Sequence, residues 1–285
     1  MTLNIGVGGE NVGRPIGDMV AVVRASGADV VGLQETIGSE VHGVRPDGGQ
    51  KLADLLGWNY LAQPGGCGVL TRFPIVRASP HKHGALLRTN AGRAVWLFNT
   101  HLAHAPYQPY QLLGIPYAGA PNLSTAAEAV AAARAARGAQ VEAVLADIRA
   151  ASDVPGQTII VTGDFNEPSH LDWTDAATQA GRCPLPVPFP SAKALTDAGF
   201  VDAYRAIHPD PVARPGHTWT PMTDPTDPAD RHDRIDFVLV RGAAVEDAVV
   251  VGERAPAADL VVNPWPTDHR AVLAVLRLSN GATRH

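Results

Sequence analysis

Charged and amide side chains recur where segments that otherwise read as buried strands come to an end. Glu35 directly follows the apolar run 30–34, and Asp236 sits inside the apolar segment 234–238. The complete set of such residues is Asn4, Glu35, His101, Asp164, Asn166, Asp236, Asp268 and His269. A buried strand excludes a carboxylate unless that carboxylate is paired or binds a metal. The pattern therefore predicts one cleft where several strand ends meet and oxygen ligands hold a divalent cation.

Five short segments that contain these residues resemble the motif blocks of the endonuclease/exonuclease/phosphatase superfamily, the DNase I-like metal-dependent phosphoesterases. In chain order they are Gln34–Glu35, Asn99–Leu102, Gly163–Asn166, Arg234–Phe237 and Thr267–His269. A single Gly-Asp-Phe-Asn segment is a weak signal, whereas five blocks in order between Asn4 and Leu276 are specific. The strand-turn-strand at 67–75, and Arg137 with Gln140 on the following helix, add to the resemblance.

The resemblance implies both a fold and a reaction. The fold is an α/β (α+β) four-layer sandwich, in which two packed, mainly antiparallel β-sheets are flanked by helices. The reaction is hydrolysis of a phosphoester with Mg²⁺ or Mn²⁺, and Ca²⁺ is a further candidate. Glu35 would be the main metal ligand, helped by Asn4, and Asp268 would bind the metal or orient a ligand. Such a small ligand set suits Mg²⁺, which keeps several of its waters.

The resemblance also assigns the catalytic roles. Asp164 would orient or deprotonate the attacking water, and Asn166 would bind a phosphate oxygen. His269 would contact the phosphate and be held by Asp236, whose carboxylate would raise the pKa of the imidazole. His101 would be a second phosphate-facing histidine, with a packed core histidine as the alternative. The resemblance leaves two candidates for the general base, which are Asp164 and a hydroxide bound to the metal.

Two features depart from the family pattern and bear on specificity. Where the DNase I branch places a glutamate to partner its first histidine, residues 63–66 contain no acid, so the resemblance supplies no partner for His101. A Pro/Tyr-rich insertion at about 103–123 separates His101 from the next helix, and it reads either as a specificity lid or as a packing loop. The candidate substrate-binding residues are Tyr107, Tyr110, Trp219, His217 and Arg234.

The elements that must position these residues can be read from apolar periodicity and turn residues. Helices are expected at 15–26 and 48–56, and a long one capped by Ser124 should reach about Ala151. The expected strands are 2–7, 29–33, 58–62, 67–71, 75–78, 86–89, 94–102, 157–162, 233–240, 245–252 and 271–278. Strands outnumber helices, which fits a two-layer β-sandwich flanked by helices. The resemblance covers nearly the whole chain and implies a single domain over 1–280 with a short tail at 281–285.

Composition narrows the class of protein and of partner. The 285 residues include 45% hydrophobic and 18% charged side chains, which are globular values. The formal charge is -5, lysines stand only at 51, 82 and 193, and no basic run is present, so nucleic acid is allowed as a partner but not favoured. Cys67 and Cys183 match no zinc spacing and are expected to be packed free thiols.

No apolar stretch is long enough for a transmembrane helix, and no export signal is visible in the chain as it stands. These features predict a cytoplasmic protein, or a secreted one if a signal has been removed ahead of Met1. No protein partner is indicated.

Three functions therefore compete. The first is a phosphodiesterase or phosphatase that acts on a small-molecule or lipid-headgroup phosphoester. The second is a Mg²⁺-dependent nuclease on DNA or RNA, and the third is a non-catalytic binding module that keeps the fold. The complete set of catalytic residue types argues against the third.

Overall fold

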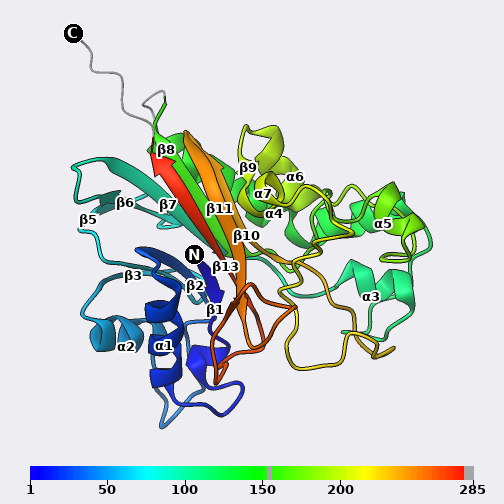
Figure 1. Cartoon of the computed structure of the whole chain (residues 1–285), viewed down its shortest axis with the longest axis horizontal. Coiled ribbons are helices and arrows are strands. Elements are labelled where there is room, and N and C mark those ends of the chain that lie inside the picture. Colours follow the sequence, from blue (N-terminus) through cyan, green and yellow to red (C-terminus); the bar gives the residue numbers. More distant parts are fainter. Residues whose placement is uncertain (153–155, 279–285) are drawn as a thin grey trace.

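The computed structural model describes residues 1–152 and 156–278, and it shows two β-sheets packed face to face (Figure 1). One sheet has the strand order β12 (Leu260–Val261), β11 (Ala243–Gly252), β13 (Ala271–Leu278), β1 (Thr2–Asn4), β2 (Val30–Gln34), β4 (Cys67–Thr71) and β3 (Asn59–Gln63). The other has the order β5 (Ile75–Ala78), β6 (Gly84–Arg88), β7 (Ala94–His101), β8 (Thr158–Asp164), β10 (Asp236–Arg241) and β9 (Val201–Asp202).

The centre of each sheet is a parallel pair, although antiparallel pairs predominate elsewhere. β1 runs parallel to β2, with Asn4 opposite Gln34, and β7 runs parallel to β8, with His101 opposite Asp164. Strand β10 is antiparallel to β8 and places Asp236 opposite Asp164. Because the carboxyl ends of parallel strands lie at one edge, this register collects the polar strand ends at one end of the sandwich.

Helices cover both outer faces and complete four layers. Helices α1 (Ile16–Ser26) and α2 (Gly48–Leu56) pack on the seven-stranded sheet through the apolar cluster that contains Met19, Val23 and Leu33. Helices α4 (Ala126–Ala151) and α6 (Pro190–Asp197) cover the six-stranded sheet (Figure 1). The expected four-layer sandwich is confirmed. The other helices are η1 (Val7–Gly9), α3 (Gln108–Leu113), α5 (Asp175–Gln179) and α7 (Ala203–Ile207).

Local chemistry explains one correction. The long helix α4 is capped by Thr125 and not by Ser124, because Thr125 has a glutamate three residues later. The Thr125 hydroxyl accepts a hydrogen bond from the Glu128 N–H at 3.2 Å, and the Glu128 carboxylate accepts one from the Thr125 N–H at 3.0 Å. This reciprocal pair satisfies two N–H groups at the helix start.

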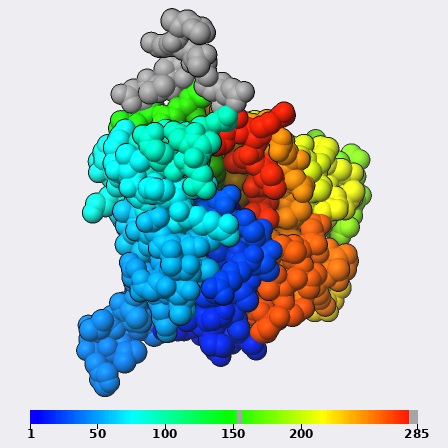
Figure 2. All heavy atoms as spheres, turned by 60° about the vertical axis from the view of Figure 1, so that its left-hand side comes forward, coloured from blue at the N-terminus to red at the C-terminus, as the bar shows by residue number. Residues whose placement is uncertain are grey.

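The first and last strands of the domain are neighbours. β1 pairs antiparallel with β13, and Figure 2 shows the blue N-terminal segment beside the red C-terminal strand on one face. Cys67 and Cys183 are both buried free thiols, as expected. None of the helices that the structure describes is long and apolar enough to cross a membrane.

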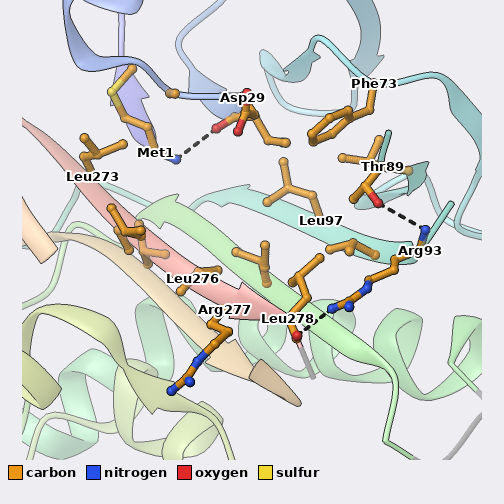
Figure 3. Close-up of a pocket in the computed structure, with 18 of the residues that line it drawn as sticks. Met1, Asp29, Phe73, Thr89, Arg93, Leu97, Leu273, Leu276, Arg277 and Leu278 are labelled. Carbon is orange, nitrogen blue, oxygen red and sulfur yellow. Dashed lines mark hydrogen bonds between the residues drawn. The ribbon is translucent and has the colours of Figure 1, made fainter. Parts of the chain in front are cut away.

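A hollow of about 1000 Å³, larger than the others described below, lies at the end of the sandwich remote from the polar strand ends. Its walls include Met1, Phe73, Leu97 and Leu276 (Figure 3). Among the described residues of its lining, Asp29 is the only carboxylate and none is a histidine. Size alone would select this hollow as the site, but its lining has too few ligands or acid–base groups for phosphoester chemistry.

The Pro/Tyr-rich insertion is tied to α4 by a buried arginine. The Arg137 guanidinium donates to the Gln108 side-chain oxygen at 2.6 Å and to the Pro106 carbonyl at 2.9 Å. It also lies 3.7 Å from the Glu167 carboxylate, and both charged side chains are fully buried. The insertion is therefore an ordered wall attached to the helix layer.

Replacing Arg137 with methionine should lower the free energy of unfolding by about 3 kcal/mol, because Glu167 would be left buried without its cation. Urea denaturation measures this loss. Arg134→Met changes an exposed arginine one turn earlier on α4 and should shift stability by less than about 0.5 kcal/mol. Equal effects of the two substitutions would show that the buried contacts of Arg137 contribute nothing.

Candidate active site

A cavity of about 350 Å³ opens where β1, β2, β7 and β8 end and where β10 and β13 begin. Its lining residues are Glu35, His101, His104, Tyr107, Tyr110, Tyr117, Asp164, Asn166, Trp219, Ile235, Asp268 and His269. Of the predicted residues, only Asn4, Asp236, Arg234 and His217 are outside this lining. Asn4 and Asp236 stand directly behind it, because each bonds a lining residue.

Asn4 joins the two carboxylates at the floor of the cavity. Its side-chain amide is fully buried and donates to Glu35 Oε1 at 3.2 Å and to Asp164 Oδ2 at 3.0 Å. The other Glu35 oxygen accepts from the Val7 N–H at 3.0 Å. Glu35 itself has a φ of 53°, a left-handed conformation that is costly for a residue with a side chain. These contacts hold the Glu35 carboxylate in place while 32% of it stays exposed toward the cavity.

His101 is surrounded by partners that the sequence did not reveal. Its Nε2 atom lies 3.0 Å from the Asn166 side-chain amide, 3.5 Å from Asp164 Oδ2 and 4.0 Å from Glu35 Oε1. Asn166 is fixed in turn, because its N–H donates to Asp164 Oδ1 at 2.8 Å and its amide donates to the Leu102 carbonyl at 3.1 Å. Asn166, Asp164 and Glu35 are thus the polar neighbours of His101 Nε2 in this structure.

His269 and Asp236 form a buried ion pair beside Asp164. The His269 Nδ1 atom is 3.0 Å from Asp236 Oδ2, and its Nε2 atom is 3.7 Å from Asp164 Oδ2. Burial alone would lower the pKa of His269, but the charges of Asp236 and Asp164 and the hydrogen bond to Asp236 raise it to about 10. The imidazole is therefore protonated at neutral pH, with Nε2–H directed toward the Asp164 carboxylate.

The donor set suits a hard divalent cation. Asp164, Asp236 and His269 offer ligand atoms that all lie within 4.8 Å of one another, but His269 is protonated and pairs with Asp236. The carboxylates that line the cavity itself are Glu35, Asp164 and Asp268. Three carboxylates in one small cavity repel one another, and a cation with oxygen ligands removes that repulsion.

Aromatic side chains from the insertion form the opposite wall. The Tyr107 and Tyr110 rings are 4.9 Å apart and nearly perpendicular, and the Tyr110 and Tyr117 rings are 5.6 Å apart in the same arrangement. Tyr107 donates its hydroxyl to Asp233 Oδ2 at 2.9 Å, and the Tyr117 hydroxyl lies 2.7 Å from His104 Nδ1. The sequence did not single out His104 and Ile235 as lining residues, and Tyr117 was indicated only as part of the Pro/Tyr-rich insertion, within which His104 also lies.

Comparison with known proteins decides the family. The sequence profile described as "Endonuclease/Exonuclease/phosphatase family" matches residues 1–269. The chain belongs to this family. Members of the endonuclease/exonuclease/phosphatase family are divalent-metal-dependent hydrolases of phosphoesters, and this chain is an enzyme of that class.

Proteins similar to this family member match it at low sequence identity. The uncharacterized protein F14F9.5 of Caenorhabditis elegans is 26% identical over 298 residues, covering 96% of this chain and 89% of the relative. The endonuclease/exonuclease/phosphatase structure from Beutenbergia cavernae has a TM-score of 0.59 at 20% identity, covering 97% of this chain and 70% of that one. The 3′ phosphatase NExo from Neisseria, bound to a product DNA hairpin, has a TM-score of 0.51 at 17% identity, covering 96% and 98%.

Two expected substrate contacts of this family member are not at the cavity. Arg234 is 2% exposed, and its guanidinium bonds Asp172 and Asp202 at 2.8–3.1 Å, so its charge is already neutralised inside the protein. His217 lines a separate small hollow beside Arg231. The predicted placement of both residues at the substrate cleft is therefore wrong, whereas Trp219 does line the cavity.

The surroundings of His217 predict a pH-dependent stability. Burial and then the charges of Arg231, His232 and Arg270 lower the pKa of His217 from its ordinary 6.5 to about 3. Between these values only the unfolded chain takes up the proton, so the free energy of unfolding falls as the pH drops below about 6.5. His217→Gln should therefore lose about 2 kcal/mol less stability than the wild type between pH 7 and pH 5.

Urea denaturation at both pH values measures this difference. His81→Gln is the control, because His81 is exposed. If His217→Gln loses as much unfolding free energy between pH 7 and pH 5 as the wild type, then His217 takes up its proton in the folded protein as readily as in the unfolded chain.

Proposed function

We propose that this enzyme hydrolyses the phosphoester bond of a compact substrate, as a phosphodiesterase or phosphatase on a small-molecule or lipid-headgroup ester. The observation that carries the proposal is a cavity of about 350 Å³ with carboxylates and an imidazolium at one end and aromatic rings at the other. None of the described residues that line it is a lysine or an arginine. A strand of nucleic acid brings further phosphates next to the reacting one, and proteins usually meet these with basic side chains.

Glu35, Asp164 and Asp268 would hold the metal, with Asn4 fixing the first two, and we infer that the ion is Mg²⁺ or Mn²⁺. Oxygen-only donors favour these ions over softer metals. When bound, the cation supplies charge stabilisation for the phosphoryl oxygens. Asn4 contributes through its amide, which donates to Glu35 and Asp164 at once and so sets their separation.

The protein groups around the phosphate divide the remaining work. His269 is protonated and would donate from Nε2 to a phosphate oxygen, with Asp236 holding its ring from the other side. Asn166 would donate its amide to a second phosphate oxygen, since that amide faces the cavity beside His101. Such fixed donors stabilise negative charge as it develops, which is the main requirement of phosphoryl transfer.

Asp164 would orient the attacking water and take its proton. Its Oδ1 atom is held by the Asn166 N–H, while Oδ2 receives the Asn4 amide and faces His101 and His269. A carboxylate fixed on both oxygens cannot rotate, so a water on its cavity side is placed in one direction. This geometry supports Asp164 as the general base.

A nuclease is the second candidate function. The Neisseria structure, whose title names a 3′ phosphatase with a product DNA hairpin, shares the fold along nearly the whole length of both chains. A screen with Mg²⁺ separates the candidates by comparing rates on soluble phosphomonoesters and phosphodiesters, lipid headgroups, and single- and double-stranded DNA and RNA. Activity confined to the nucleic acids would overturn the compact-substrate proposal.

Replacing Glu35 with glutamine should lower kcat/KM by about 10³-fold or more on any accepted substrate, because a metal-binding charge is lost. His269→Ala should lose a similar factor through the missing phosphate donor. Steady-state kinetics measure both, and circular dichroism checks that the variants remain folded. The control is Glu40→Gln, which removes the same charge at an exposed position five residues along the chain and should keep the wild-type rate.

Removal of the metal should abolish hydrolysis. Dialysis against EDTA should reduce the rate to background, and added Mg²⁺ or Mn²⁺ should restore it. The same ions should raise the melting temperature of the wild type but not of Glu35→Gln, because only a bound ion stabilises the folded state. Full activity after EDTA treatment would contradict the metal assignment.

A further inference from the structure

The aromatic wall of the cavity consists of Tyr107, Tyr110, Tyr117 and Trp219, and it faces the catalytic end. Tyr107 is only 5% exposed and forms the back of the wall, whereas Tyr117 is 36% exposed at its mouth. The Trp219 ring lies 5.0 Å from the His269 ring, and the Trp219 backbone pairs with that of His269. A group esterified to a phosphate at His269 would therefore reach the wall through a short linker.

One carboxylate stands behind this wall. Asp230 Oδ1 accepts the Tyr110 hydroxyl and, at 3.4 Å, the Trp219 indole N–H. Its other oxygen accepts the Thr223 hydroxyl at 2.5 Å, and the Arg231 N–H donates to Oδ1 at 2.6 Å. Two of the wall's rings thus direct their polar hydrogens to a single acid. Donation to a carboxylate increases the electron density of the ring that donates.

The charge of Asp230 is not cancelled by a neighbouring cation. Burial alone would raise the pKa of Asp230, but the hydrogen bonds from Thr223, Tyr110 and the Arg231 N–H bring it below its usual value, so the group is ionised. Within residues 1–152 and 156–278, no ion pair involves Asp230. The neighbouring acid Asp233 differs, because Arg231 pairs with it at 3.3 Å.

Electron-rich ring faces backed by an ionised carboxylate attract organic cations. A cation within about 6 Å of the centroid of a Trp or Tyr ring is bound more tightly than a neutral group of the same shape, and clusters of such rings recognise quaternary ammonium ligands. A second anionic group would be repelled by Asp230 and would find no lysine or arginine among the described residues that line the cavity. The wall therefore selects for a positive or neutral group of small size.

We propose that the wall of Tyr107, Tyr110, Tyr117 and Trp219, with Asp230 behind it, is a subsite for a small alkylammonium group linked to the phosphate. The ligand class is an ammonioalkyl phosphoester, such as an ester of phosphocholine or phosphoethanolamine, either soluble or as a lipid headgroup. The inference rests on the proposed function for the position of the phosphate. It adds that the group next to the phosphate is recognised by its charge.

The test compares two ligands that differ only in charge. Phosphocholine carries a trimethylammonium group, and 3,3-dimethylbutyl phosphate replaces the nitrogen with carbon at nearly the same shape. Isothermal titration calorimetry of the full chain with Mg²⁺ should give a Kd about tenfold lower for phosphocholine. Equal affinities, or tighter binding of the neutral ligand, would overturn the proposal without any variant being needed.

A charge-removing variant then assigns the preference to the wall. Asp230→Asn should reduce the affinity ratio of the two ligands from about tenfold to about twofold, because the carboxylate behind the rings is gone. Asp227→Asn is the matched control: it removes a charge from the same loop, and Asp227 contacts only the Ala229 N–H through its side chain. The control should keep the wild-type ratio. A ratio unchanged in Asp230→Asn would refute the role of that residue.

Further measurements distinguish a lipid ligand from a soluble one, and they distinguish failure of the subsite from failure of the proposed function. Sedimentation with phosphatidylcholine vesicles, compared with phosphatidylglycerol vesicles, tests the lipid form, and calorimetry tests the soluble form. Preferred binding of the choline form in either arm supports the subsite, and its absence from both overturns it. Hydrolysis of p-nitrophenyl phosphocholine is measured separately. A protein that prefers phosphocholine but hydrolyses no phosphoester would retain the subsite and lose the proposed function.

Discussion

The structure depends on the burial of one carboxylate at the meeting point of both sheets. Asp164 has no exposed surface, yet its oxygens are approached by Asn4, Asn166, His101 and His269. Burying a charge is costly unless hydrogen bonds and opposite charges surround it. Asn166 lies two residues after Asp164, but Asn4, His101 and His269 come from distant parts of the chain, so the fold as a whole must bring them to within a few ångströms of Asp164.

The register of the paired strands brings these residues together. The parallel pairs place Asn4 beside Gln34 and His101 beside Asp164, and the antiparallel pair places Asp236 opposite Asp164. A slip of one residue in any of these pairs would turn a polar end group to the other face of its sheet. The apolar residues of the same strands fix the register by packing into the core. The apolar residues that pack the core therefore also fix where the polar residues of the candidate site lie.

Much of this could be predicted from the sequence, because a carboxylate in an apolar strand breaks a strong rule. Asp236 and Asp164 stand out on that ground alone, and the order of the motif blocks supplied the fold. Arg234 could not be placed in the same way, because its partners Asp172 and Asp202 are 62 and 32 residues away and nothing local marks them. The sequence around a charged residue near a motif does not indicate whether that residue contacts a substrate or a buried acid.

The two ends of the cavity are held by different forces, which bears on how selectivity arises. Backbone ladders place the strand ends that carry the polar residues, whereas side-chain bonds position the aromatic wall: Arg137 anchors the insertion, and Asp230 and Asp233 hold Tyr110 and Tyr107. Removing a wall contact leaves the strand register intact, so the wall can change while the polar strand ends stay in place. The formal charge of -5 includes acids that already have partners, because Asp236 is paired with His269 and Asp230 accepts a hydrogen bond from Tyr110 of the wall. Overall charge therefore says less about the substrate than the sign of the few groups that line this cavity.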